Sequence, residues 1–246
     1  MAKNILSPGS KKYTHLKELA YEANREIPRL NLAIFTFGNV SAFDPDLGAL
    51  AIKPSGVPYA GLGPQDMVVL DLDGTVIQGK LRPSSDTPTH LELYRSIPGI
   101  RGIVHTHSTY ATSWAQAARA IPLYGTTHAD FSPEAIPCVP FLTAGEVAGA
   151  YEANTGTSIV KHFATLGLDF HHCPMTLLAG HGPFTWGEDP QKAVYHAAVL
   201  EQIAYMAWMT ESLGQTKPLP AHYGEKHFSR KHGPNAYYGQ SNHTKV

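Results

Sequence analysis

The sequence predicts one α/β domain in which helices pack on a mixed or antiparallel sheet. Strand-like and helical segments alternate along most of the 246 residues, and several neighbouring strand-like runs are spaced as hairpins. No internal repeat, low-complexity run or Gly/Ser linker divides the chain. Hydrophobic residues make up 43% of the chain and the net charge is only −1, which excludes disorder as its main state.

The first half predicts two helices and a set of strands between them. Apolar residues recur at helical spacing over 13–27, and Pro28 ends that helix. An Asp-Leu-Asp-Gly turn at 71–74 joins two of the strand-like runs as a hairpin. The predicted strands are 31–37, 49–53, 67–71 and 75–78, and the second helix is 87–97.

The second half predicts helices around two short buried strands. The strands are 102–107 and 175–179, and the helices are 109–119, 143–153, 156–166 and 190–212. From residue 214 onward the chain is rich in His, Lys, Gly, Pro and Tyr and has weak periodicity. No element is predicted there.

Composition and charge exclude several classes of protein. The N-terminus has no apolar core long enough for a signal peptide, and no apolar run is long enough to cross a bilayer. The body has no basic stripe of the kind that binds nucleic acid, and two cysteines outside any Cys-x-x-Cys pair suggest no disulfide framework. We therefore expect a cytoplasmic protein without a membrane or nucleic-acid partner.

Two numbers in the composition depart from the norm. Charged residues make up 16% of the chain, against roughly 25% in soluble domains, which suggests surface hidden in an oligomer. There are also 14 histidines, and imidazole serves both metal binding and proton transfer.

The clearest local motif is a histidine pair that ends a buried strand. In Gly102-Ile103-Val104-His105-Thr106-His107, the two-residue period of a strand places both imidazoles on one face. Two imidazoles so placed can bind one cation, although this spacing alone is equally compatible with hydrogen-bonded structural histidines.

Two further segments strengthen the metal interpretation. His181 follows a strand and lies between two glycines, which let backbone and ligand approach closely. Asp86 stands at a helix entry, where His90, one turn later, competes with it as a ligand or supports the site. Three imidazoles and a carboxylate suit Zn²⁺ or a similar divalent ion such as Mn²⁺.

Motifs in a fixed order give the chain a family resemblance. Gly-Asn-Val-Ser at 38–41, Lys-Pro-Ser-Gly at 53–56, Pro-Ser-Ser-Asp at 83–86, the histidine pair and Gly-His-Gly at 180–182 resemble the class II aldolase/adducin-like family. Gly-Thr-Thr-His-Ala-Asp at 125–130 and the ending at 230–240 are similar to its L-ribulose-5-phosphate 4-epimerase branch. The resemblance covers residues 13–240, with an N-terminal extension at 1–12 and a tail at 241–246 outside it.

The resemblance implies an α/β fold with a central, largely antiparallel sheet flanked by helices on both faces. It implies a homotetramer with active sites between subunits, acting on a sugar phosphate. It assigns Asp86, His105, His107 and His181 as Zn²⁺ ligands, and Asp130 and Tyr238 as acid–base residues, with Tyr238 from the adjacent subunit. It also assigns Gly38, Asn39, Ser55, Gly56, Ser84 and Ser85 to substrate phosphate, and Glu152, His227 and Arg230 as accessory residues.

These residue types suit an epimerisation at C4 of L-ribulose 5-phosphate. The hydrogen on C4 is not acidic, so a retro-aldol route is needed: loss of the C4 hydroxyl proton cleaves the C3–C4 bond, and re-addition to the opposite aldehyde face inverts the centre. That route needs a metal ion to stabilise the enediolate and a proton carrier on each side of C4. Gly/Ser segments supply N–H and hydroxyl donors for phosphate, although the same residues also form ordinary turns.

Other functions fit parts of the pattern. A class II aldolase that cleaves a deoxy-ketose 1-phosphate is the rival within the family, but that branch usually carries Glu where Asp86 stands. A non-enzymatic structural branch lacks the metal ligands that this chain retains. The sequence leaves the physiological metal and the pathway open, whether arabinose, ascorbate or another pentose source.

Overall fold

The computed structural model describes residues 9–234 and 236–239, and these form an eight-stranded sheet with helices on both faces. The strand order is β4-β3-β2-β1-β5-β8-β7-β6, and every neighbouring pair is antiparallel except β6 and β7. The strands are β1 Asn39–Asp44, β2 Ala49–Ile52, β3 Val68–Asp71, β4 Val76–Gln78, β5 Gly102–His105, β6 Cys138–Val139, β7 Met175–Leu178 and β8 Pro183–Gly187. This arrangement confirms the predicted fold class.

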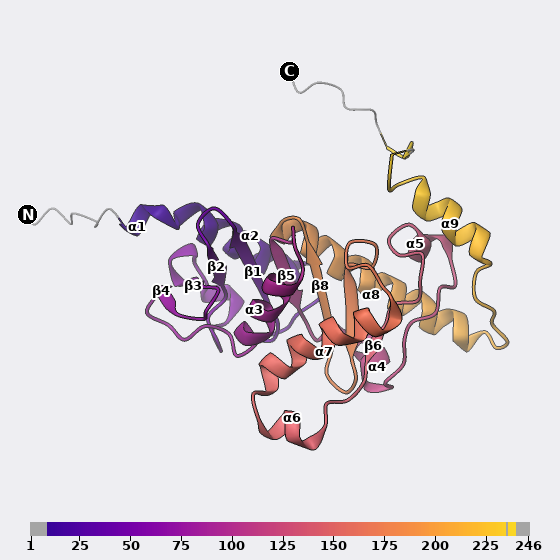
Figure 1. Cartoon of the computed structure of the whole chain (residues 1–246), viewed down its shortest axis with the longest axis horizontal. Coiled ribbons are helices and arrows are strands. Elements are labelled where there is room, and N and C mark those ends of the chain that lie inside the picture. Colours follow the sequence, from indigo (N-terminus) through magenta and orange to yellow (C-terminus); the bar gives the residue numbers. More distant parts are fainter. Residues whose placement is uncertain (1–8, 235, 240–246) are drawn as a thin grey trace, which may run out of the picture.

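The helices begin and end largely where the periodicity predicts. They are α1 Gly9–Lys12, α2 Thr14–Arg29, α3 Thr87–Ser96, α4 Thr109–Gln116, α5 Thr126–Ala129, α6 Ala144–Ala148, α7 Tyr151–Leu166, α8 Pro190–Ser212 and α9 Ala221–Ser229, with 3₁₀ turns η1 Tyr59–Gly61 and η2 Pro64–Asp66. Figure 1 shows the sheet crossing the molecule from β4 to β8, with α9 beyond the far end beside α5.

The two faces of the sheet carry side chains of different size. Ala42 and Ala51 are cross-strand partners that pack under Leu16 of α2. On the other face, Leu50 and its neighbours pack with α3 and α7 in the largest core cluster. Because a strand alternates its side chains between the two faces of the sheet, these alanines lie on the face that α2 covers. Their small side chains let α2 approach the sheet closely.

One predicted strand is wrong. Residues 31–37 form turns, and β1 starts only at Asn39. Asn31 and Phe35 adopt left-handed backbone conformations with φ of 56° and 55°, which interrupt an extended run. The aromatic ring of Phe35 is 76% exposed, so the apolar run there is not a core strand.

Several elements were not predicted, among them β1, β6, β8, α5 and α9. The strand β8 begins with a proline after a glycine-rich turn. The helix predicted over 143–153 ends at Ala148, because Gly149 and Ala150 interrupt it before α7. The tail contains α9, in which Gly224 is the buried residue and the other side chains are exposed or half-buried. The proposed extension at 1–12 and the tail at 241–246 lie mostly or wholly outside the described residues.

Candidate active site

Three imidazoles converge where β5 ends beside the β7–β8 turn. His105 is the last residue of β5, His107 follows two positions later, and His181 lies at the tip of the turn. One ring nitrogen from each can be chosen so that the three atoms lie within 4.8 Å of one another. The distance between Nε2 of His105 and Nε2 of His107 is 3.1 Å.

Backbone contacts hold the histidine-bearing segments together. Gly182 has no room for a side chain, because a Cβ there would lie 2.7 Å from the carbonyl oxygen of Thr106 and 3.2 Å from Cδ2 of His107. Nδ1 of His105 lies 3.0 Å from the carbonyl oxygen of Pro183, which fixes the ring and leaves Nε2 facing the cluster. The hydroxyl of Tyr151 is 3.4 Å from Nδ1 of His181.

Burial favours the neutral form of two of these histidines, His107 and His181. Burial and the neighbouring His105 lower the pKa of His107, and burial followed by His105 and His107 lowers the pKa of His181 to about 4. Metal binding requires the neutral imidazole, and tetrahedral Zn–N bonds of about 2.0–2.1 Å place two ligand nitrogens roughly 3.3 Å apart. The donor set and its spacing therefore fit a divalent ion.

Asp86 lies beside the three histidines but is not among the atoms within 4.8 Å. It caps α3, and its Oδ2 accepts a 2.6 Å hydrogen bond from Nδ2 of Asn39. Burial raises the pKa of this carboxyl, but electrostatic interactions with His105 and His90 and the hydrogen bond from Asn39 lower it on balance. A carboxylate held ionised at this place can complete the donor set.

His90 is buried behind Asp86. Its Nδ1 lies 2.7 Å from Oγ of Ser41, whose Oγ is also 2.7 Å from the hydroxyl of Tyr94. Burial lowers the pKa of His90 to about 3, so its ring is neutral. This buried network supports the start of α3, where Asp86 stands.

The three segments predicted to bind phosphate lie next to each other. Pro54 and Pro83 form a β-bridge, and the amide of Ser84 donates to the carbonyl oxygen of Lys53 at 3.0 Å. The Asn39–Asp86 bond joins the first segment to the third. Ser55, Gly56 and Ser85 are exposed beside them, whereas Ser84 is buried and Gly38 adopts a φ of 76°. Together the segments place N–H and hydroxyl groups at one edge of the site.

Lys53 is a charged residue of this site that motif reasoning overlooked. Its side chain is only 2% exposed, and its Nζ lies 3.3 Å from the carbonyl oxygen of Thr36 and 4.8 Å from the ring centroid of Tyr59. Burial lowers its pKa to about 8. In the sequence, the lysine of Lys-Pro-Ser-Gly cannot be told apart from an ordinary turn residue. Only its burial in the structure distinguishes it from one.

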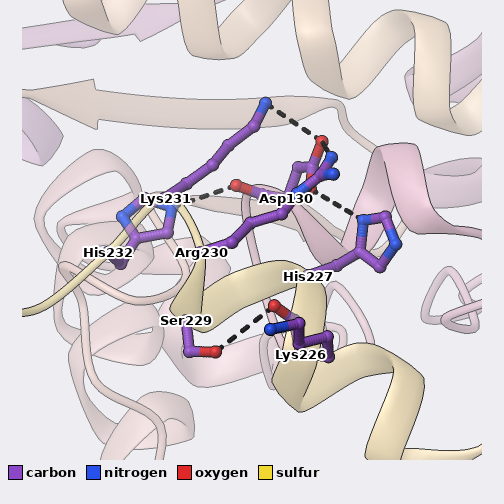
Figure 2. Close-up of polar contacts among 7 residues, drawn as sticks. All are labelled: Asp130, Lys226, His227, Ser229, Arg230, Lys231 and His232. Carbon is purple, nitrogen blue, oxygen red and sulfur yellow. Dashed lines mark hydrogen bonds and ion pairs between the residues drawn. The ribbon is translucent and has the colours of Figure 1, made fainter. Parts of the chain in front are cut away.

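Asp130 lies at the centre of a cluster of basic side chains (Figure 2). Nη2 of Arg230 and Nζ of Lys231 both lie 3.0 Å from its Oδ2, and Nδ1 of His227 lies 3.1 Å from its Oδ1. His232 Nε2 also lies 3.0 Å from its backbone oxygen. Burial opposes ionisation, but hydrogen bonds from Arg230, Lys231 and His227 lower the pKa of this carboxyl.

Tyr238 reaches the same place from the chain end. Its ring is 4.3 Å from Nζ of Lys231 and 5.1 Å from Cζ of Arg230, and the residue is 63% exposed. Asp130, Lys231 and Tyr238 line a cavity of about 530 Å³ together with His196 of α8. The structure thus brings the two predicted acid–base residues, far apart in sequence, to one cavity of one subunit.

This cavity and the histidine cluster lie at opposite ends of the central strands. The cavity is lined by Ile100, before β5, and Gly187, which ends β8. His105 lies at the opposite end of β5, where it pairs with Phe184 of β8. The β5 strand alone spans about 10 Å, so one subunit does not bring Asp130 to its own histidines.

Glu152, a predicted accessory residue, lies in the first turn of α7 next to Tyr151. Its backbone oxygen accepts a 2.7 Å hydrogen bond from Oγ1 of Thr89 in α3. Tyr151 and His181 share a cavity of about 350 Å³ with Phe141. This places Glu152 near the histidine cluster rather than near Asp130.

Comparisons with known proteins agree with this architecture. Residues 18–208 match the profile of the Class II Aldolase and Adducin N-terminal domain. YgbL of Escherichia coli, a proposed aldolase/epimerase/decarboxylase, is 25% identical, with a TM-score of 0.69 over 88% of this chain and 99% of that one.

Two aldolases share the fold at lower identity. One L-fuculose 1-phosphate aldolase is 24% identical, with a TM-score of 0.74 over 88% of this chain and 95% of that one. The L-fuculose 1-phosphate aldolase of Glaciozyma antarctica PI12 is 18% identical, with a TM-score of 0.71 over 94% of this chain and 87% of that one.

Within the described residues, none of the helices has the length and apolar character needed to cross a membrane.

Proposed function

Because the chain belongs to the class II aldolase and adducin family, we propose that it is a metal-dependent epimerase that interconverts L-ribulose 5-phosphate and D-xylulose 5-phosphate. The observation that carries this proposal is the shared cavity of Asp130 and Tyr238. An epimerisation by cleavage and re-addition needs two proton carriers that act on opposite faces of one carbon. A carboxylate and a phenol at one cavity provide such a pair.

The metal and substrate groups have separate roles in this proposal. Asp86, His105, His107 and His181 would hold Zn²⁺, with Mn²⁺ as an alternative. A bound ion of this kind would act as a Lewis acid that stabilises negative charge on substrate oxygens. Gly38, Asn39, Ser55, Gly56, Ser84 and Ser85 would bind the phosphate, and the buried Lys53 beneath them adds a positive charge.

The proton carriers act at the C4 oxygen. One of Asp130 and Tyr238 takes the C4 hydroxyl proton as the C3–C4 bond breaks, and the other returns a proton after the aldehyde has turned over. His227 and Arg230 hold the carboxylate in place through hydrogen bonds of 3.1 and 3.0 Å. Glu152 would assist from the metal side.

A complete site requires two subunits in this proposal. The histidine cluster and the Asp130 cavity lie at opposite ends of β5 and β8, so each cavity would face the histidines of a neighbour. We propose a homotetramer in which Asp130 and Tyr238 of one subunit serve the metal site of the next.

Complementation between two inactive variants tests this arrangement. Subunits carrying His107→Ala and subunits carrying Tyr238→Phe are refolded together at equal amounts. If the site is shared between neighbours, random assembly restores about a quarter of the wild-type activity. Absence of recovery in mixed oligomers would show that each subunit builds its own site.

Turnover tests the reaction itself. The purified protein is incubated with L-ribulose 5-phosphate, with and without a chelator, and D-xylulose 5-phosphate formation is followed. We expect metal-dependent conversion, and a large loss of turnover in Tyr238→Phe with metal content and folding unchanged. Wild-type turnover in that variant would contradict the role of Tyr238.

The second candidate is an aldolase that cleaves a deoxy-ketose 1-phosphate. The similarity of the fold to that of L-fuculose 1-phosphate aldolases favours it. Cleavage of a ketose 1-phosphate without epimerisation would establish this candidate, and failure of both reactions would favour the non-enzymatic branch. Asp86, in place of the Glu usual in the aldolases, favours the epimerase.

A further inference from the structure

Lys231 lies between the two proposed proton carriers. Its Nζ is 3.0 Å from Oδ2 of Asp130 and 4.3 Å from the ring centroid of Tyr238. Its side chain is 20% exposed, and the ring of Phe131 lies 5.2 Å from its Nζ. We propose that Lys231 is the positioning residue that joins Asp130 and Tyr238 into one unit at the cavity. This inference rests on the proposed epimerase function.

Tyr238 depends on this contact for its position. The tyrosine is 63% exposed, its ring contacts the two cations, and its amide donates a 3.0 Å hydrogen bond to the oxygen of Arg230. An exposed aromatic side chain otherwise moves among several rotamers. Because Asp130 holds the ammonium of Lys231 in place, the ring of Tyr238 can form a cation–π contact with it at a defined position.

Lys231 differs from Arg230 in the side of Asp130 that it occupies. Arg230 directs Nε and Nη2 at the carboxylate, but it does not line the cavity, whereas Lys231, Asp130 and Tyr238 do. His227 likewise contacts the carboxylate without lining the cavity. Arg230 and His227 therefore hold Asp130 from behind, and Lys231 is the cation on the side from which substrate would enter.

Other titratable groups face this cavity without occupying the same position. Lys192 and His196 of α8 line it, together with His171 and Glu188 from the loops. The ammonium of Lys192 lies 4.9 Å from the ring centroid of Tyr195, and Nδ1 of His196 lies 2.7 Å from the oxygen of Trp186. Lys231 is thus the cation that contacts both proton carriers on the cavity side.

Three variants test the proposal. Lys231→Met keeps the aliphatic stem and removes the charge, and Lys231→Arg keeps the charge. Lys226→Met is the matched control, because Lys226 lies in the same segment and its ammonium lies 5.1 Å from the ring of Tyr237 instead. The kcat and KM for L-ribulose 5-phosphate are measured for each, with a thermal scan to confirm folding.

A positioning role predicts a specific split of these constants. We expect Lys231→Met to lower kcat by about 100-fold, the order of loss from misplacing a reacting group, with KM within about threefold. Lys231→Arg should recover most of kcat, and Lys226→Met should match the wild type. A kcat of Lys231→Met within twofold of the wild type would overturn the proposal, as would a loss that Lys231→Arg does not repair.

Hydrogen exchange separates this proposal from the proposed function. The amides of Tyr237 and Tyr238 both donate to the oxygen of Arg230, at 2.9 and 3.0 Å, so their exchange reports whether the segment is docked. We expect exchange of the Tyr238 amide to accelerate at least tenfold in Lys231→Met and to stay unchanged in Lys226→Met, because the ammonium of Lys226 contacts the ring of Tyr237 instead. If the wild type does not epimerise, the proposed function fails, and unchanged exchange in Lys231→Met would separately overturn the role of Lys231.

Discussion

The substitution Gly182→Ala should weaken metal binding without replacing a ligand. Gly182 follows His181 in the β7–β8 turn, and its φ is not in the left-handed region, so alanine suits the backbone. The added Cβ would lie 2.7 Å from the carbonyl oxygen of Thr106. That oxygen belongs to the backbone between His105 and His107, so it cannot rotate away.

The structure gives the scale of the effect. Ordinary van der Waals contact begins near 3.4 Å, so the turn and the end of β5 must separate by more than half an ångström. That movement draws His181 away from His105 and His107, while metal–ligand distances tolerate only about ±0.2 Å. Overpacking of this kind costs about 1–3 kcal/mol, which corresponds to roughly a fivefold to 150-fold loss of zinc affinity.

Competition with a chromophoric chelator measures that affinity directly. Gly145→Ala is the matched control, because it adds the same methyl group in α6 with nothing within 4 Å. We expect the control to bind zinc as the wild type does. If Gly182→Ala also binds zinc with wild-type affinity, the close approach at Thr106 does not set the histidine geometry and the reasoning fails.

Three further predictions follow from charges and burial. Because Arg230, Lys231 and His227 outweigh burial and lower the folded-state pKa of Asp130, its ionised form stabilises the fold above its ordinary pKa. That stability should be lost as the pH falls below about 4. In Asp130→Asn, the free energy of unfolding measured at a series of pH values should therefore fall less steeply at acid pH. An unchanged decrease at acid pH would argue against this role of Asp130. Zinc at 100 times its Kd should raise the free energy of unfolding by about 2.7 kcal/mol, and a thermal scan of His181→Ala should show little of that shift. Burial raises the pKa of both Cys138 and Cys173 to about 11, so a thiol reagent at pH 8 should label the native protein slowly and the unfolded protein rapidly.

Local sequence was sufficient for most elements and for the histidine cluster. Helical spacing of apolar residues located α2, the length of an apolar stretch located α8, and the two-residue spacing of His105 and His107 indicates their geometry at a strand end. The predicted strand at 31–37 failed because apolar residues there are exposed in turns with left-handed backbone at Asn31 and Phe35. Periodicity reports apolar spacing, and it does not report whether an apolar run is buried.

The sequence by itself determined the α/β class and the residue types available for metal and phosphate binding, because these depend on short-range spacing. Only the tertiary structure decided that Asp130 is held by Arg230 and Lys231, and that this cluster lies at the opposite end of the central strands from the histidines. Contacts between residues about 100 positions apart depend on how α9 packs against α5, and no local pattern encodes that packing. The charge balance around Asp130 is therefore a property of the fold rather than of any motif.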